Sequence, residues 1–458
     1  MKDTKRQITR YAFYDQTAMQ NHFEKMALDG WLIEKINAYF LQFRRIEPQK
    51  LHIAVTYFPD ASEFDPAPSD KQRMMEDFAA KDGWKLLLRW GQMQVFCNDA
   101  KEPTPIETDP VTQVETIYRA MKKNLLPTHS LMLALAIYQL IFNGYRMISD
   151  PVDFLSTTYL LASLPVWLLI FLAEINEILT CFRWHRKAKP AAENGIFVPV
   201  RTNHFLTVTL LLSSAFVLLS TILLPNELRF VSLSWAAIIF GITLFGHGLK
   251  YKLKKAGFSR GFNYAITIFI TILLSVSFLI GLVFVIMRFG LEDGREPVDS
   301  YERNGWTFQI YDEPMPLYVE DMMEIGDSTW SRERNVHNET LLLAVSEYRQ
   351  NYIQGGPEGL RDLNYTIIDI KVPALYDTIK ESLLNERQDE VYDDYIFTDH
   401  YEPVDATIWN TNEAYQLHWS GSILNTYLIC WENRIVEIKF YWQPTPEQIA
   451  VVVEKLKN

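Results

Sequence analysis

Four ionisable residues lie at the ends of long apolar stretches and could together bind an ion or transfer protons. They are Glu174, Glu177, His204 and His247. Carboxylate and imidazole groups in membrane-spanning helices often mark ion or proton pathways. The plainer interpretation is that these side chains contact lipid headgroups and neighbouring basic residues. Their position at the ends of the apolar stretches favours this second interpretation.

The tripeptide Asp-Gly-Trp occurs twice, at residues 29–31 and 82–84. A glycine just after a helix adopts the left-handed conformation that other residues avoid, and the next residue can fold back onto the last turn. We therefore predict that Gly30 and Gly83 end two helices. Trp31 and Trp84 would then cover the ends of those helices, and the alternative is that both line a ligand pocket.

Motifs for catalysis and metal binding are absent from the sequence. It has no P-loop, no GxGxxG after a strand, no HExxH, no GxSxG and no CxxC pair, and its nine histidines are dispersed. Cys97, Cys181 and Cys430 lie far apart, and we interpret each as a small buried residue. We expect no enzyme activity, no cofactor and no metal.

One acidic segment could bind calcium through its carboxylates. Its members are Asp389, Glu390, Asp393 and Asp394. They lack the spacing of an EF-hand, so a solvated loop is the favoured interpretation.

Five apolar stretches are candidates for membrane spans, each of which needs about 20 residues. They lie near residues 131–147, 154–173, 205–224, 230–249 and 264–287. The first is the weakest, because Gln139, Asn143 and Arg146 interrupt it.

Basic residues concentrate in two connections between these stretches. Five Lys and Arg residues lie within 181–204 and five more within 247–263. Short basic loops stay in the cytoplasm. The N-terminus is polar and carries no signal peptide, so we expect it in the cytosol. Both basic loops then face the cytosol only if all five stretches span, which predicts a multi-pass protein of the cell membrane with an extracytoplasmic C-terminus.

The acidity of the chain lies in its last third. The net charge is −12 overall, yet residues 291–458 hold 13 Lys and Arg against 32 Asp and Glu, a net charge of −19. Nucleic-acid binding requires a basic surface. We therefore expect no nucleic acid as a direct partner.

Residues 8–97 contain two copies of a strand-helix-hairpin unit. The first has a strand near 8–14, a helix capped by Asp15 and a hairpin over 32–45. The second has a strand near 51–58, a helix that begins at Ser69 and a hairpin over 85–97. We expect one sheet with both helices on the same face.

This arrangement is similar to the duplicated modules of gyrase-inhibitor-like drug-sensing domains, which hold small molecules between their copies. By this analogy of fold alone, Glu34, Tyr39 and Trp90 would line a ligand cleft, with Trp31 and Trp84 as further candidates.

Several short runs in the same region resemble one protein family. They are Ala18-Met19, Met26-Ala27-x-Asp29-Gly30-Trp31, Tyr57-Phe58-Pro59-Asp60-Ala61-Ser62 with Phe64-Asp65-Pro66, Trp90-Gly91-Gln92-Met93-Gln94-Val95-Phe96 and Pro103-Thr104-Pro105-Ile106-Glu107-Thr108-Asp109-Pro110. These runs resemble the bacterial family DUF 2812 over residues 8–125. The resemblance implies a bacterial membrane protein with a cytosolic N-terminal domain, and it supplies no catalytic residues. Genes of the family often lie beside those of PadR-like transcription regulators, which implies such a regulator as a partner.

The sequence after this domain changes character twice. Prolines within 102–110 predict a semi-rigid linker. The apolar face of Val111, Val114, Ile117, Tyr118 and Met121 then predicts an amphipathic helix on the inner leaflet, within a segment of residues 101–128. Beyond the spans, strands are expected near 306–311, 365–372, 426–431 and 434–442, and helices near 317–325, 375–384 and 445–455.

Together these patterns predict an α-helical multi-span membrane protein with three parts. A cytosolic α+β domain covers residues 1–100, a transmembrane domain 129–290 and an acidic extracytoplasmic α+β domain 291–458. Soluble domains on both faces of the bilayer favour a sensor, regulatory or interaction protein of the bacterial cell envelope. The alternative is an accessory subunit of a transport or drug-resistance system, with a membrane transporter as its partner.

Overall fold

The computed structural model describes residues 3–8, 11–37, 40–223, 226–289, 297–303, 306–385, 390–392, 395–397, 399–419 and 421–457. The chain divides into two compact units. Unit 1 comprises Met1–Ile137, Leu168–Ala215 and Leu228–Gly290, and unit 2 comprises Tyr138–Trp167, Phe216–Glu227 and Leu291–Asn458.

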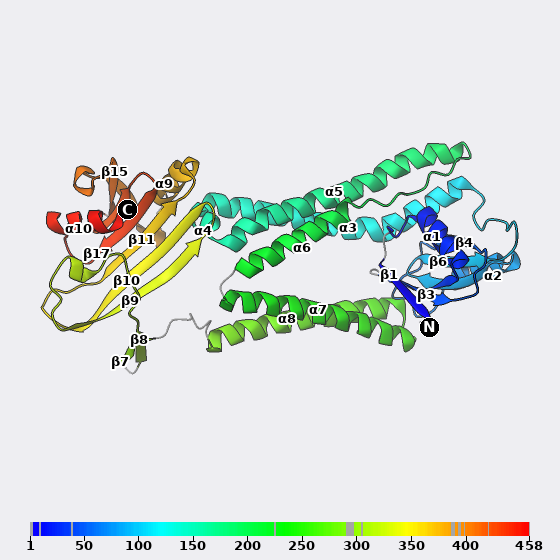
Figure 1. Cartoon of the computed structure of the whole chain (residues 1–458), viewed down its shortest axis with the longest axis horizontal. Helices are drawn as coiled ribbons and strands as arrows, with labels where there is room; N and C mark the ends of the chain where they lie inside the picture. The colour runs from blue at the N-terminus through cyan, green and yellow to red at the C-terminus, as the bar shows by residue number, and fades with distance from the viewer. Residues whose placement is uncertain are drawn as a thin grey trace. The chain divides into compact units, whose positions relative to one another are not determined.

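Unit 1 begins with an α+β module, which we call the N-terminal module (Figure 1). Its elements are β1 (Thr4–Ile8), α1 (Gln16–Leu28), β2 (Trp31–Ile36), β3 (Phe40–Arg45), β4 (His52–Tyr57), α2 (Asp70–Lys81), β5 (Lys85–Trp90) and β6 (Met93–Asn98). The order is strand, helix and hairpin, twice. The first strand ends at Ile8, before the predicted 8–14. Tyr14 instead lies in a non-strand segment with its side chain in the core.

The strands of the N-terminal module form two sheets of three strands, where we expected one sheet. Their orders are β1-β3-β2 and β4-β6-β5. The edge strands β2 and β5 each carry a register shift, between Ile33 and Lys35 and between Leu86 and Leu88. Such bulges twist an edge strand and interrupt its pairing, which explains why the two edges do not join into one ladder.

Both Asp-Gly-Trp tripeptides end helices, as predicted. Gly30 and Gly83 have φ values of 82° and 83°. The N–H of Gly30 donates to the Ala27 carbonyl and that of Gly83 to the Ala80 carbonyl, each at 3.1 Å. These bonds satisfy carbonyl groups that the helix leaves without partners.

In the described residues, six helices lie between the N-terminal module and the first strand of unit 2 in the sequence. They are α3 (Pro110–Ser149), α4 (Pro151–Ser156), α5 (Thr158–Glu193), α6 (Phe205–Leu223), α7 (Asn226–Lys255) and α8 (Arg260–Phe289). Three helical segments in the described residues are long and apolar enough to cross a membrane, namely Pro110–Ser149, Thr158–Glu193 and Arg260–Gly281. Phe205–Leu219 in α6 is a shorter apolar helix.

Helix α3 is continuous over 40 residues, with Pro127 inside it. The sequence predicts two separate elements here, an amphipathic helix and a first span, so this prediction is wrong. The apolar face that we assigned to the lipid surface is buried against protein, because Val114 packs with Ala188 and Ala192 of α5, and Ile117 and Met121 join the core of the N-terminal module.

Unit 2 is built on a seven-stranded antiparallel sheet (Figure 1). Its order is β14-β15-β16-β17-β11-β10-β9. The strands are β9 (Ser328–Glu339), β10 (Leu343–Gly355), β11 (Leu363–Ile370), β14 (Asp399–Pro403), β15 (Glu413–Trp419), β16 (Ser422–Cys430) and β17 (Arg434–Phe440). Helices α9 (Tyr376–Asn385) and α10 (Pro446–Leu456) pack on it, and the short pairs β7 (Asp299–Arg303) with β8 (Trp306–Ile310) and β12 (Glu390–Tyr392) with β13 (Tyr395–Phe397) lie apart. The helix predicted at 317–325 is a single 3-10 turn, Val319–Asp321.

The second apolar stretch starts later than predicted. Residues 154–156 belong to the short helix α4, which Asp150 caps and Pro151 begins. Phe154 and Leu155 are buried with Leu343, Ile368 and Ile370 of the sheet. The long helix α5 starts only at Thr158, so the apolar residues before it serve the core of unit 2.

Candidate functional site

A short loop with three acidic residues joins β4 to α2 in the N-terminal module. We call residues 58–66 the acidic loop. Its fold is set by local bonds: the Ala61 N–H donates to the Phe58 carbonyl at 3.0 Å, and the Ser62 N–H donates to the Asp65 carboxylate at 2.7 Å. The side-chain amide of Gln92 holds the loop through the Pro59 carbonyl at 2.9 Å. These bonds leave Asp60 and Glu63 available to neighbouring helices.

Each acidic side chain of the loop pairs with a different helix. Asp60 accepts a hydrogen bond from Lys123 of α3, Glu63 lies 2.6 Å from the Lys250 ammonium of α7, and Asp65 lies 3.8 Å from the Arg260 guanidinium of α8. The hydrogen bond from Lys123 is the largest influence on Asp60 and lowers the pKa of this carboxyl below its usual value. The acidic loop therefore contacts three helices through oppositely charged side chains.

Polar and aromatic contacts reinforce the link with α8. The side-chain amide of Asn263 donates to the Phe64 carbonyl at 2.9 Å, and Asn263 is fully buried. The Phe64 and Tyr264 rings meet edge to face at 5.3 Å between centroids. A buried amide needs partners of this kind, so this contact fixes the position of the loop more firmly than the exposed ion pairs do.

Asp15 joins the N-terminal module to the segment between α5 and α6. One carboxylate oxygen caps α1 by accepting from the Ala18 N–H at 3.2 Å. The other accepts from both the N–H and the hydroxyl of Thr202, at 2.8 and 2.6 Å. Because Asp15 is buried, losing either set of donors would leave a buried carboxylate oxygen without a hydrogen bond, which is energetically costly.

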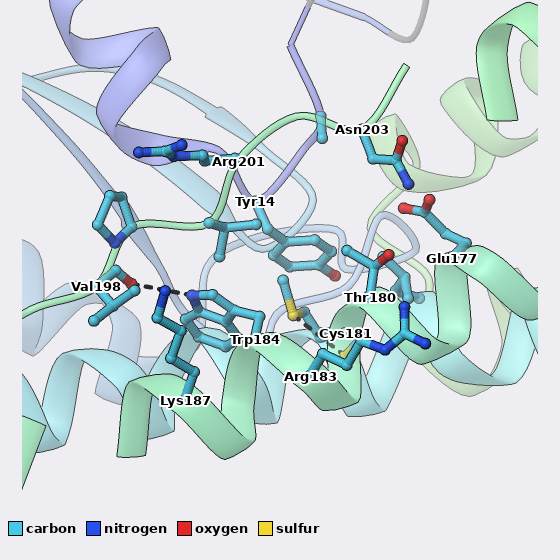
Figure 2. A pocket seen from close by; sticks show the side chains of 15 residues that line it. Tyr14, Glu177, Thr180, Cys181, Arg183, Trp184, Lys187, Val198, Arg201 and Asn203 are labelled. Carbon is cyan, nitrogen blue, oxygen red and sulfur yellow. Dashed lines mark hydrogen bonds between the residues drawn. The ribbon is translucent and has the colours of Figure 1, made fainter. Parts of the chain in front are cut away.

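Beside this contact lies a cavity of about 400 Å³, which we call the module–helix cavity (Figure 2). It is lined by the N-terminal module, α3, α5 and residues 198–203. Its apolar wall is formed by Tyr14, Met121, Leu125, Trp184 and Val200. The Trp184 indole N–H donates a hydrogen bond to the Val198 carbonyl at 3.0 Å, and this contact closes one side of the cavity.

The charged groups around the module–helix cavity are mostly cationic. Arg183, Lys187 and Arg201 line it, with Glu177 as the acidic member (Figure 2). Within the part of the chain that the structure describes, these three cations form no ion pair. An apolar wall beside unpaired cations suits a ligand with a hydrophobic body and an anionic group.

The four ionisable residues predicted as an ion or proton site do not form one group. Glu174 and Glu177 lie one turn apart on α5, near His129, whereas His204 and His247 belong to other segments of unit 1. Glu174 is buried and its carboxylate lies 2.5 Å from the His129 imidazole of α3. Glu177 lines the module–helix cavity, and exposed His204 precedes α6. His247 contacts the Thr243 carbonyl of its own helix at 2.9 Å. The partner of Glu174, His129, was absent from our prediction.

The aromatic and acidic residues predicted for a ligand cleft also separate. Trp84 is buried, its indole donates to the Thr104 carbonyl at 2.8 Å, and it lines a cavity of about 460 Å³ with Glu107. Trp31 lies near the cationic groups of Lys5 and Arg45. Glu34 is exposed and accepts from the Gln42 amide at 2.9 Å.

Trp90 and Tyr39 are the remaining residues of the predicted ligand cleft. Trp90 packs edge-on against Phe13, and it lines a cavity of about 670 Å³ together with His247 and Lys250. The structure thus brings together one residue from each predicted site. Tyr39 lies outside the described residues.

Other predictions concern cysteines and acidic residues. Cys97, Cys181 and Cys430 are free and buried, as predicted. Asp389, Asp393 and Asp394 lie outside the described residues, and Glu390 begins β12.

Sequence reasoning missed the acidic loop and Thr202. The sequence contains the loop within the run Tyr57-Phe58-Pro59-Asp60-Ala61-Ser62, which indicates the family resemblance but not the contacts with the helices. Three acidic residues in a domain that we placed beside two basic loops could have indicated the ion pairs. Thr202 carries no comparable signal, because its partner Asp15 is 187 residues away in the sequence.

Comparison with known proteins gives one result for a defined part of the chain. No curated protein and no solved structure is significantly similar to this chain. Residues 15–128 match the model of a family described as a protein of unknown function, DUF2812. This segment contains α1, the acidic loop and the first part of α3. The resemblance predicted from the sequence is thereby confirmed, and residues 15–128 carry the DUF2812 segment of this protein.

Proposed function

We propose that this protein is a membrane-embedded sensor or regulator in which the N-terminal module responds to the arrangement of the helices. The observation that carries the proposal is the set of contacts made by the acidic loop. Asp60, Glu63 and Asp65 pair with α3, α7 and α8. A relative movement of these helices must break or strain at least one pair, so the position of the loop depends on the state of the helices.

The contact of Asp15 with Thr202 adds a fourth connection, to the segment between α5 and α6. The module–helix cavity lies against this connection and shares Asn203 and Arg201 with the same segment. A ligand with an anionic group in this cavity would bind one arrangement of the segment better than another. Differential binding of this kind is what shifts a conformational equilibrium.

The topology that we propose has five spans, with a cytosolic N-terminus and an extracytoplasmic C-terminus. Contacts within unit 1 support it. Lys250 and Arg260 from one basic loop pair with the N-terminal module, and Thr202 from the other bonds to Asp15. These contacts support a topology in which both basic loops lie on the same side as the module, and short basic loops remain in the cytoplasm. Reporter fusions at residues 1 and 458 that report the same compartment would overturn this topology.

The regulatory role can be tested by purifying the full chain with its partners from gently solubilised membranes. The acidic-loop variant carries Asp60→Asn, Glu63→Gln and Asp65→Asn. Its matched control carries Asp70→Asn, Asp77→Asn and Asp99→Asn, three exposed acidic residues of the same module. We expect a regulatory protein, such as a PadR-like regulator, to accompany the wild type and the control in amounts that change in the acidic-loop variant. Identical partners in all three samples would contradict the proposal.

A second candidate role is that of an accessory subunit of a transport system. It is favoured by the buried contact of Glu174 with His129, which joins two long helices. An ionisable pair of this kind inside a helix bundle fits a proton or ion relay. Glu174→Gln would then abolish the export of a substrate carried by the partner transporter. Unchanged export in this variant would remove the support for this role.

A further inference from the structure

Two neighbouring strands of the unit 2 sheet bring together two histidines and a glutamate. His400 and Glu402 lie on β14, and His418 lies on β15. His400 and Glu402 are two residues apart and therefore point to the same face of the sheet. The antiparallel register places His400 directly opposite His418. The sequence alone does not indicate this group, because His418 is separated from His400 and Glu402 by the segment that joins β14 to β15.

The geometry of the three side chains is that of potential metal ligands. The nearer oxygens of the Glu402 carboxylate lie 3.1 Å from Nε2 of His400 and 3.7 Å from Nε2 of His418. The two imidazole rings are 5.6 Å apart between centroids. One ligand atom from each residue falls within 4.8 Å of the other two. Small rotations of these side chains bring such atoms to the roughly 2.0–2.2 Å that Zn²⁺ requires from nitrogen and oxygen ligands.

The backbone that carries these ligands is held in place by the core. Tyr401 and Leu417 pair across the same two strands, one position along, and Leu417 is buried with an exposed fraction of 1%. A slip of one residue would move every side chain to the opposite face, so burial of Leu417 fixes the register of the histidines. Ligands mounted on strands are positioned more accurately than ligands on loops.

We propose that His400, Glu402 and His418 form a binding site for a divalent transition-metal ion such as Zn²⁺. Two imidazoles and one carboxylate form a ligand set that Zn²⁺ uses when a fourth position is left to water or a second ligand. Imidazole ligands favour Zn²⁺, Ni²⁺ and Cu²⁺ over Mg²⁺ and Ca²⁺, which prefer oxygen. The bound ion joins β14, the edge strand of the sheet, to β15. This inference goes beyond the proposed function and does not depend on it.

The test uses the full chain, purified in detergent with a tag that contains no histidine and treated with a chelator. Zn²⁺ is titrated against a competing fluorescent chelator, with Mg²⁺ and Ca²⁺ as comparison ions. We expect one Zn²⁺ per chain to bind ahead of any weaker sites, with no comparable binding of Mg²⁺ or Ca²⁺. His400→Ala and His418→Ala should each weaken this binding by about tenfold or more.

The matched control is His337→Ala. His337 also lies on a strand of unit 2, but among the described residues its one acidic ion-pair partner is Glu339, at 3.9 Å. Glu402→Gln serves as the conservative variant, because glutamine keeps the shape and removes the charge. It should weaken Zn²⁺ binding while the metal-free protein unfolds at the same temperature as the wild type. Hydrogen exchange at β14 should slow on Zn²⁺ addition in the wild type and in His337→Ala only. Wild-type affinity in His400→Ala or His418→Ala, or an equal loss in His337→Ala, overturns the proposal.

Discussion

Thr202 donates its backbone N–H and its hydroxyl to the same carboxylate oxygen of Asp15, at 2.8 and 2.6 Å. The other oxygen of Asp15 caps α1. The Thr202 hydroxyl also accepts a hydrogen bond from the Ala12 N–H at 3.0 Å. Thr202 thus provides hydrogen-bond partners for the Asp15 carboxylate and the Ala12 N–H, both at the start of α1.

Thr202→Val removes the hydroxyl and keeps the shape and the backbone N–H. It should lower the free energy of unfolding by about 1–3 kcal/mol, because a buried carboxylate loses one donor and the Ala12 N–H loses its acceptor. Chemical unfolding of the full chain in detergent measures this change. Thr128→Val is the control, since the Thr128 hydroxyl donates to the Asn124 carbonyl of its own helix. Equal stabilities of the two variants would contradict the role given to Thr202.

Glu107 makes the stability of the N-terminal module depend on pH. Burial raises the pKa of Glu107 from its ordinary value of 4.5 to about 7. The folded state then binds a proton that the unfolded state releases between about pH 4.5 and pH 7, so stability falls as the pH rises through this range. Glu107→Gln should be more stable than the wild type at pH 8 by about 1–2 kcal/mol, a value reduced for partial exposure to solvent.

At pH 4 the same two proteins should have nearly equal stability, because Glu107 is protonated in both states of the wild type. Unfolding curves at both pH values measure the difference. A difference between Glu107→Gln and the wild type that stays constant from pH 4 to pH 8 would show that burial does not raise the pKa of this carboxyl.

Alanine variants of Gly30 and Gly195 distinguish two contributions to the free energy of unfolding: strain in the backbone and steric contact of the new Cβ. Their φ values are 82° and 77°. A Cβ at Gly30 would lie 3.1 Å from the Ile46 carbonyl oxygen, whereas a Cβ at Gly195 would meet nothing within 4 Å. Gly195→Ala should cost about 1–2 kcal/mol from the left-handed backbone alone. Gly30→Ala should cost about 1 kcal/mol more, because the neighbouring chain must shift. Thermal unfolding measures both, and a smaller loss for Gly30→Ala would refute this account.

Exchanging charges tests the pair between Glu63 and Lys250. Glu63→Lys places two cations side by side and should speed hydrogen exchange in the acidic loop. The double variant Glu63→Lys with Lys250→Glu restores opposite charges and should recover most of the protection, with a coupling energy of about 1 kcal/mol or less for a pair this exposed. Lys252→Glu alone is the control for charge on α7. A double variant that exchanges as fast as Glu63→Lys would exclude this pair as a connection.

Local signals in the sequence predicted local structure well. Asp15 and Ser69 cap α1 and α2 through the N–H groups of Ala18 and Gln72, and Thr445 caps α10 in a capping box with Gln448. These contacts join residues three positions apart, so the sequence contains both partners in one window.

Predictions that depended on distant partners were less successful. The amphipathic face of α3 predicts a lipid-facing surface, because nothing near it in the sequence shows that Ala188 and Ala192 cover Val114. Strand β9 was not predicted, since its polar residues follow no clear alternation. The metal-ligand group on β14 and β15 depends on a strand register that periodicity alone does not give.

The position of residues 181–202 has a consequence for the biogenesis of the protein. The core of the N-terminal module includes Cys181 and Val200, with Trp184 and Phe197 packed against it, although the DUF2812 segment ends at residue 128. A ribosome therefore completes the DUF2812 segment before it has made the residues that finish the core of this segment. The core of the N-terminal module is therefore complete only after residues 181–200 have been made, and a fragment cut at residue 128 would lack Cys181, which contacts Met121.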